Sequence, residues 1–145
     1  MGQFSVFTDH SRYHRSGVIF ACGPNIPENL ATSLPADRID WLERTITGLG
    51  QDQRWVDQAY SKMIDDLKMI SFENAPFTCR LIENFDIVLS RWTRQQLDEF
   101  WLTFARLARN APHPVILLLP TSAEYLGPQG PERVQLEAEK RLIVL

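Results

Sequence analysis

The sequence predicts an α/β fold in which helices pack on a small sheet in two or three layers. The main evidence lies between residues 82 and 120, where two short apolar runs flank an amphipathic segment of helical length. This order of elements is typical of a central β-α-β unit. At 145 residues the chain can bury a core without a metal or a disulfide, so we expect one domain over residues 1–145.

The central unit is expected to have strands at 85–89 and 115–119, because both runs are apolar and have the length of buried strands. Thr93 and Gln96 have the spacing of a capping box, so the helix should begin beside Thr93. Asn110 and Pro112 should end it. One apolar face should pack on the sheet, and it consists of Leu97, Phe100, Trp101, Phe104 and Ala108.

Two pairs of elements are expected before this unit. The runs 4–7 and 18–22 favour β-structure and predict an N-terminal β-hairpin. Asp37 and Asp52 are suitable N-caps, and apolar residues follow each of them at the helical period. A glycine-containing turn separates the two segments, which therefore predict a helical hairpin. Residues 77–81 favour either a further short strand or an approach to the central unit.

The segment 131–145 fits two templates. Pro131 suits the first turn of a helix, which a short strand at 142–145 would follow. The same residues alternate between apolar and polar side chains, apart from Lys140, as one long strand would. We prefer helix then strand, because Glu, Lys and Ala are poor strand formers. The final apolar strand should lie in the sheet or pair with another chain.

The composition argues against some functional classes, namely nucleic-acid-binding and membrane proteins. Hydrophobic residues make up 44% of the chain and charged residues 23%, as in ordinary globular proteins. The net charge of -3 does not favour nucleic-acid binding, which draws its affinity from clustered Lys and Arg. Neither a signal peptide nor a membrane-length apolar run is evident, so we expect a cytoplasmic protein without a membrane partner. Cys22 and Cys79 are expected to be reduced, buried thiols.

The segment between the two N-terminal runs concentrates reactive side chains. Asp9, His10 and His14 are candidate catalytic residues, and the i, i+4 spacing of the two histidines also makes them candidate metal ligands. Two histidines on a loop are an incomplete metal site, so we expect no metal and no cofactor. Arg12 and Arg15 are candidate anion contacts. The simplest interpretation is a solvated loop without a specific role.

Ligands of α/β proteins gather at the carboxyl ends of parallel strands. Ser90 and Arg91 follow one predicted strand, and Thr121 and Ser122 follow the other, so all four are candidate ligand or anion contacts. The sequence lacks the glycine-rich patterns that cradle phosphates in nucleotide-binding proteins. Helix capping and strand-end solvation explain these four side chains more simply.

Three of the four tryptophans are candidates for a partner interface. Trp101 lies on the apolar face of the central helix, whereas Trp41, Trp55 and Trp92 lie off the best apolar stripes of their segments. Aromatic side chains that remain exposed are enriched at protein–protein interfaces. We therefore expect these three residues to contact a partner if the fold leaves them exposed.

Together these observations favour a non-catalytic accessory or interaction subunit of a larger complex, whose partner is another protein chain in a homo- or hetero-oligomer. The alternative is a small hydrolase or phosphoryl-handling enzyme that uses the loop at 9–15. That alternative requires the loop to lie beside Ser90, Arg91 and Thr121. A further alternative is a regulatory nucleotide- or nucleic-acid-binding module that uses the basic residues of the same loop.

Overall fold

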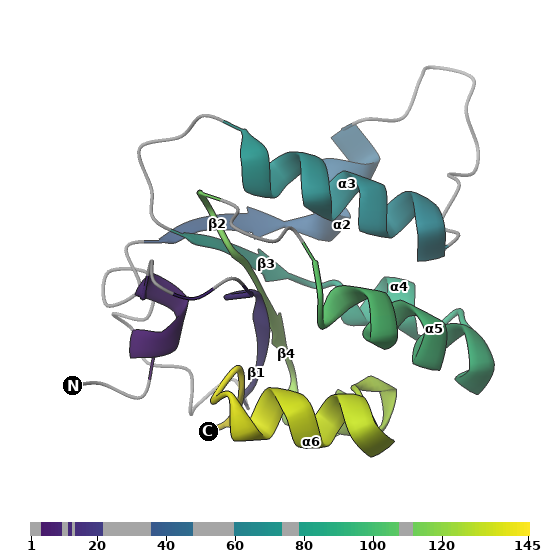
Figure 1. The fold of residues 1–145 in the computed structure, drawn as a ribbon. Helices are drawn as coiled ribbons and strands as arrows, with labels where there is room; N and C mark the ends of the chain where they lie inside the picture. The colour runs from purple at the N-terminus through teal and green to yellow at the C-terminus, as the bar shows by residue number, and fades with distance from the viewer. Residues whose placement is uncertain are drawn as a thin grey trace.

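The computed structural model describes residues 4–9, 12, 14–21, 36–47, 60–73, 79–107 and 112–145. In this part of the chain five strands form one sheet in the order β2-β3-β4-β1-β5, and all neighbouring strands are parallel. The fold is α/β, as the sequence predicts (Figure 1). The strands are β1 (Gly17–Phe20), β2 (Ala36–Asp40), β3 (Cys79–Glu83), β4 (Val115–Leu119) and β5 (Leu142–Val144).

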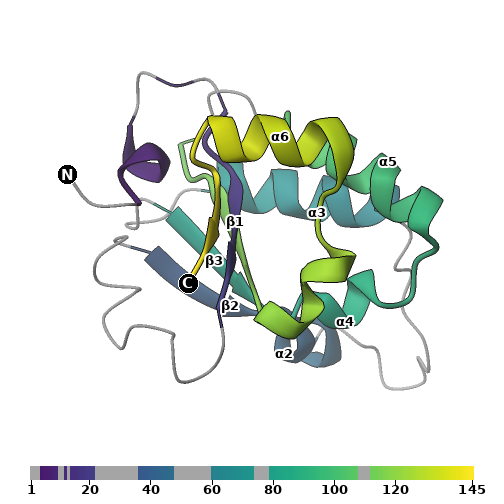
Figure 2. The ribbon, with the colours of Figure 1, turned by 90° about the horizontal axis from the view of Figure 1, so that it is seen from below.

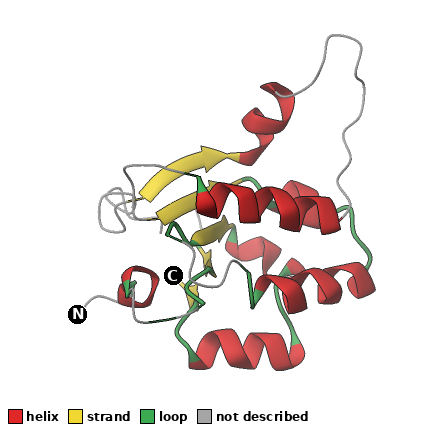
Figure 3. Ribbon diagram, turned by 45° about the horizontal axis from the view of Figure 1, so that its top comes forward, coloured by secondary structure: helices red, strands yellow, loops and turns green. Residues whose placement is uncertain are grey.

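Helices of two kinds surround this sheet. Three longer helices lie together on one face, and a short 3-10 helix lies on the other (Figures 1 and 2). Figure 3 shows the same division, with the longer helices in red on one side of the yellow strands. The longer helices are α3 (Tyr60–Phe72), α5 (Arg94–Phe104) and α6 (Gly130–Ala138), and the 3-10 helix is η1 (Ser5–Thr8).

Three short elements follow directly on strands, at the carboxyl end of the sheet. They are α2 (Trp41–Thr47), α4 (Asp86–Leu89) and the 3-10 helix η3 (Thr121–Leu126). Among the residues that the structure describes, no helix has both the length and the apolar character needed to cross a membrane.

The sheet is buried on both faces at its centre. In β1 and β4, Val18 and Leu117 face the helix layer, whereas Ile19 and Leu118 face η1 and its Phe7. Every residue of these two strands is buried. Central strands of a parallel sheet are covered on both sides, which explains why these segments are apolar throughout instead of alternating.

Two predictions for the central unit are confirmed. The strand at 115–119 is β4, and α5 begins after Thr93. Thr93 accepts a hydrogen bond from the backbone N–H of Gln96, and the Gln96 side chain accepts one from the backbone N–H of Thr93. The helix buries Leu97 and its aromatic face, as expected, but it ends at Phe104, earlier than the predicted stop.

The prediction of a strand at 85–89 is wrong. The strand that pairs with β4 is β3, and residues 86–89 form the short helix α4. Asn84 separates the two elements, with a φ of 64° in the left-handed region that Asn tolerates better than most residues. A short apolar run has the same composition in a buried strand and in a buried helix, so the local pattern could not distinguish them.

The predicted N-terminal β-hairpin is also wrong. Residues 5–8 form η1, and β1 lies between β4 and β5 with both neighbours parallel to it. Gly17 permits this arrangement, because a Cβ atom there would lie 2.1 Å from the carbonyl oxygen of Arg141 and 2.6 Å from the Phe7 ring. The β-favouring composition of the first run reflects burial of Val6 and Phe7 against the sheet.

The predicted helical hairpin needs correction at its start. Asp37 and Ile39 belong to β2, and the first helix begins only at Trp41. Asp40 takes the capping role, since its Oδ1 accepts a hydrogen bond from the backbone N–H of Glu43 at 3.2 Å. The second helix is α3, while residues 48–59, which include Asp52 and the glycine turn, lie outside the described residues.

The final segment forms helix then strand, as preferred. Pro131 lies in the first turn of α6, and β5 follows after a turn at Lys140, whose φ is 59°. Arg141 is fully buried between them and donates hydrogen bonds to the carbonyl oxygens of Ser16 at 2.7 Å and Ala105 at 2.8 Å. These hydrogen bonds connect the start of β5 to the start of β1 and to the end of α5.

Candidate functional site

The described residues of the segment before β1, which include Asp9, Arg12 and Arg15, lie at the amino end of the sheet. Arg12 donates to Asp9 at 3.4 Å in an exposed ion pair. Arg15 is only 5% exposed and donates to the carbonyl oxygen of Phe7 at 3.3 Å. Burial lowers the pKa of the Arg15 guanidinium. Arg15 therefore supports the packing of η1 on the sheet, and Arg12 is the one described arginine of this loop that is exposed.

The structure describes only one of the two candidate metal ligands of this loop. His14 is partly buried, and His10 lies outside the described residues. In the described part of the chain, no three His, Cys, Asp or Glu side chains are grouped so that they could hold a metal ion.

Cys79 lies beneath the same loop. Its thiol is fully buried and donates to the carbonyl oxygen of Phe7 at 3.7 Å, next to the Arg15 bond. Burial raises the pKa of Cys79 to about 12. The side chain is therefore a neutral thiol at physiological pH, unsuited to act as a nucleophile.

The polar residues predicted at the strand ends do lie at the carboxyl end of the sheet. Ser90 ends α4 and donates to the carbonyl oxygen of Ile87 at 2.8 Å, while Arg91 is exposed in the next turn. Thr121 and Ser122 begin η3, which packs against α4. The Oγ1 of Thr121 is buried without a hydrogen-bond partner in the described structure. The described residues of the segment 9–15 precede β1 at the opposite end of the sheet, so the structure does not bring them to these residues.

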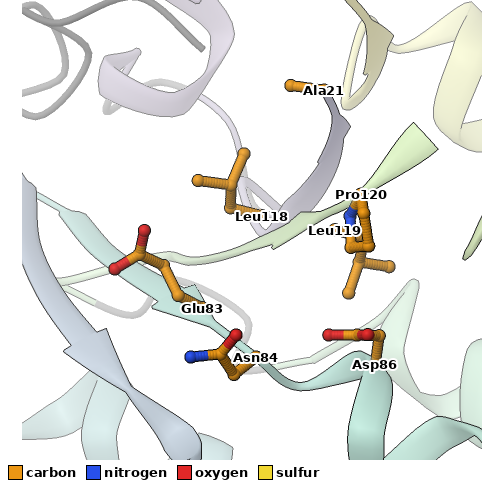
Figure 4. A pocket seen from close by; sticks show the side chains of 7 residues that line it. All are labelled: Ala21, Glu83, Asn84, Asp86, Leu118, Leu119 and Pro120. Carbon is orange, nitrogen blue, oxygen red and sulfur yellow. The ribbon is translucent and has the colours of Figure 1, made fainter. Parts of the chain in front are cut away.

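A pocket of about 250 Å³ opens at the carboxyl ends of three strands (Figure 4). Its walls combine apolar side chains with two carboxylates and an amide, so it could hold a small organic cation. Residues from the ends of β1, β3 and β4, together with the first turn of α4, line it: Ala21, Glu83, Asn84, Asp86, Leu118, Leu119 and Pro120.

The polar side chains of this pocket differ in their bonding. Glu83 pairs with Arg38 of β2. Asn84 donates to Oδ1 of Asp40 at 2.9 Å, and this bond, together with the backbone N–H of Glu43, lowers the pKa of Asp40. Asp86 makes no side-chain hydrogen bond or ion pair with any residue that the structure describes. Sequence reasoning missed this pocket because it placed residues 85–89 in a strand.

Neither of the two candidate tryptophans that the structure describes is fully exposed. Trp41 is 4% exposed and meets the Phe85 ring edge-on, with ring centroids 5.3 Å apart, so it does not meet the condition of exposure under which we expect it to contact a partner. Trp92 is partly buried and lies 5.1 Å from the ring of Phe100. Trp55 lies outside the described residues. An aromatic residue off a helical stripe can still be buried when it stands at the junction of a strand and a helix.

The two edges of the described sheet differ in chemistry. At one edge, β2 carries Asp37, Arg38 and Asp40, and charged side chains discourage the addition of a further strand. At the other edge, β5 consists of Leu142, Ile143 and Val144, and the Val144 side chain is 49% exposed. The apolar composition of residues 142–145 is the sequence signal that anticipates this surface.

Comparisons of the chain with protein-family models, with curated proteins and with solved structures give no match.

Proposed function

We propose that this chain is a non-catalytic accessory subunit that binds another protein by adding an extended segment of that protein to the outer edge of β5. The observation that supports the proposal most directly is the contrast between a charged edge at β2 and an uncharged, apolar edge at β5. Unpaired strand edges are common docking sites, since a partner's backbone extends the ladder and its alternate side chains add specificity.

The backbone of β5 is oriented for such an addition. The N–H of Val18 donates to the carbonyl oxygen of Arg141, and the N–H of Leu145 donates to that of Phe20, both at 2.8 Å. Backbone groups alternate in direction along a strand, so those of Leu142 and Val144 point away from β1. In the described structure no strand pairs with this side of β5. Two N–H groups and two carbonyl groups are thus available to a partner.

Val144→Pro tests this proposal with little effect on the fold. Proline removes the outward N–H of Val144 but none of the bonds from β5 to β1. We expect the full-length variant to keep its melting temperature within a few degrees and to lose its partner in native mass spectra of tagged protein purified from its own cells. Arg38→Ala on β2 is the matched control and should retain the partner.

Hydrogen exchange distinguishes an edge complex from any other complex. In the complex, the amides of Leu142 and Val144 should become protected, because they acquire acceptors on the partner. A complex that leaves these amides unprotected, or that Val144→Pro retains in full, would contradict docking at β5. A reducing, cytoplasmic location is part of this proposal and agrees with the free, buried thiol of Cys79.

A second candidate function is binding or conversion of a small molecule in the pocket at the carboxyl ends of the strands. Its location supports this alternative, because α/β proteins bind ligands there. Asp86 favours a small amine or guanidinium compound over a phosphate, because its carboxylate has no partner among the described residues, whereas that of Glu83 is paired with Arg38. A panel of small amines and phosphates, measured by thermal shift, tests it. Amines should raise the melting temperature of the wild type but not that of Asp86→Asn, and equal shifts for both proteins would eliminate this use of Asp86.

The loop at 9–15 contributes little to the enzyme or nucleic-acid alternatives. Arg15 is buried and Arg12 is paired with Asp9, so the described residues of this loop do not form the basic patch that such binding needs.

A further inference from the structure

The outer surface of the helix layer carries large apolar side chains on two neighbouring helices. On α3, Met69 is 68% exposed and Phe72 is 50% exposed, and on α5, Leu102 is 50% exposed. α3 and α5 lie in contact, and a groove of about 430 Å³ between them is lined by residues of both, including Phe72 and Thr103. Single exposed apolar residues are ordinary, but several on one surface mark an interaction site.

Two charged side chains flank Leu102 along the same stripe. Glu99 precedes it by one turn, and Arg106 follows it in the turn that extends α5, where the N–H of Arg106 donates to the carbonyl oxygen of Thr103 at 3.1 Å. Both side chains are exposed, and neither has an ion-pair partner among the described residues. They lie about 10 Å apart along the helix axis, too far to pair with each other within one chain.

We propose that this surface binds a second copy of the chain, with two α5 helices antiparallel across a twofold axis between Leu102 and Thr103. A twofold axis makes the contact self-complementary: if one residue of the first copy contacts a second residue of the other copy, the reverse contact also forms. In this arrangement Glu99 of each copy faces Arg106 of the partner subunit, and the Leu102 side chains pack near the axis. The same rotation places α3 of one copy on α3 of the other, which covers Met69 and Phe72.

Charge complementarity selects the second copy as the occupant. Along α5 an acidic residue, an apolar residue and a basic residue follow one another in the order Glu99, Leu102, Arg106. When a second, identical helix lies antiparallel to the first, each of the two charges therefore faces a charge of the opposite sign. The inference does not depend on docking at β5, because the helix layer lies on the face of the sheet and β5 forms its edge (Figure 2). A dimer of this kind leaves both β5 edges available.

Charge reversal and its rescue test the proposal. We expect the purified wild type to show a dimer of the 16.7 kDa chain in sedimentation velocity over a concentration series. Glu99→Arg and Arg106→Glu should each weaken the dimer by roughly tenfold or more, because each creates two like-charge contacts. The double variant, Glu99→Arg with Arg106→Glu, should restore dimer formation. Both positions are exposed, so all variants should keep the helical content and melting temperature of the wild type.

Lys140→Glu is the matched control, since it reverses an exposed charge in the turn before β5 and should leave the dimer unchanged. A wild type that stays monomeric throughout the series would overturn the proposal. So would folded single variants whose dimers persist, or a double variant that stays monomeric. Recovery of a complex with a different protein from the chain's own cells, lost on charge reversal while the purified chain is monomeric, would assign this surface to that partner instead.

Discussion

The indole of Trp41 meets the ring of Phe85 edge-on, with ring centroids 5.3 Å apart and ring planes inclined by 74°. Both residues stand where a parallel strand gives way to a short helix, after β2 and after β3. Because Asp40 and Glu83 are aligned partners in these two strands, the residues that follow them converge. Phe85 also contacts the aromatic face of α5, since the ring centroids of Phe85 and Phe100 are 5.8 Å apart.

This contact makes Trp41 a residue of the core. Trp41→Ala should lower the free energy of unfolding by about 3 to 5 kcal/mol, the usual loss when a buried aromatic side chain is removed. Urea denaturation followed by far-ultraviolet circular dichroism measures it. Trp92→Ala should cost less, because Trp92 is only partly buried. If Trp41→Ala left stability unchanged and abolished partner binding, Trp41 would instead be an interface residue.

The capping box of α5 should contribute to stability, and a control in the same turn can isolate that contribution. Thr93→Ala should reduce the free energy of unfolding by about 1 kcal/mol, because the backbone N–H of Gln96 loses its acceptor. Gln95→Ala, at an exposed position in the same first turn, should change stability by less than about 0.5 kcal/mol. Equal losses in the two variants would show that the cap contributes nothing specific.

Arg141 should dominate the attachment of β5. Arg141→Met keeps much of the volume but leaves the carbonyl oxygens of Ser16 and Ala105 buried without donors. We expect the free energy of unfolding to fall by about 2 to 5 kcal/mol, because each buried carbonyl left without a donor costs about 1 to 3 kcal/mol, and we expect faster hydrogen exchange in β5. Arg133→Met is the control, because its ion pairs with Glu124 and Glu137 are partly exposed and should be worth about 1 kcal/mol or less. If the β5 amides of Arg141→Met exchanged as slowly as those of the wild type, Arg141 would not be needed to hold β5 in the sheet.

Cys79 should make the free energy of unfolding depend on pH only at high pH. Burial raises the pKa of the native thiol from its ordinary value of 9.0 to about 12. Below pH 9 the thiol is protonated in both the folded and the unfolded chain, and its contribution to stability is complete. Between pH 9 and 12 the unfolded chain loses the proton first, so stability falls as pH rises.

Comparison with Cys79→Ala isolates this effect, because the variant should lose less stability than the wild type over the same pH interval. In a Cys22→Ser background, the native thiol of Cys79 should also resist aromatic disulfide reagents until the chain unfolds. Rapid labelling of the folded protein at neutral pH would show that the thiol is accessible, contrary to its burial.

The parts of the fold that the sequence predicted are those in which several local signals agree. For α5, the Thr93 and Gln96 cap coincides with the start of an apolar face. For β4, an all-apolar run of strand length is followed by Pro120, and for the final segment Pro131 marks the start of α6. The carboxyl-end location of Thr121 and Ser122 followed from the same reasoning, because strand direction alone sets which end they occupy.

The sequence by itself therefore determined the fold class, the cap of α5, the strand β4 and the order of helix and strand in the last segment. Tertiary structure decided which apolar runs became strands, since residues 86–89 and 5–8 form short helices while β3 and β1 occupy the sheet. It also decided the burial of Trp41 and the identity of the sheet edges. These outcomes depend on which residues meet across the sheet, and local periodicity carries no information about contacts between distant segments.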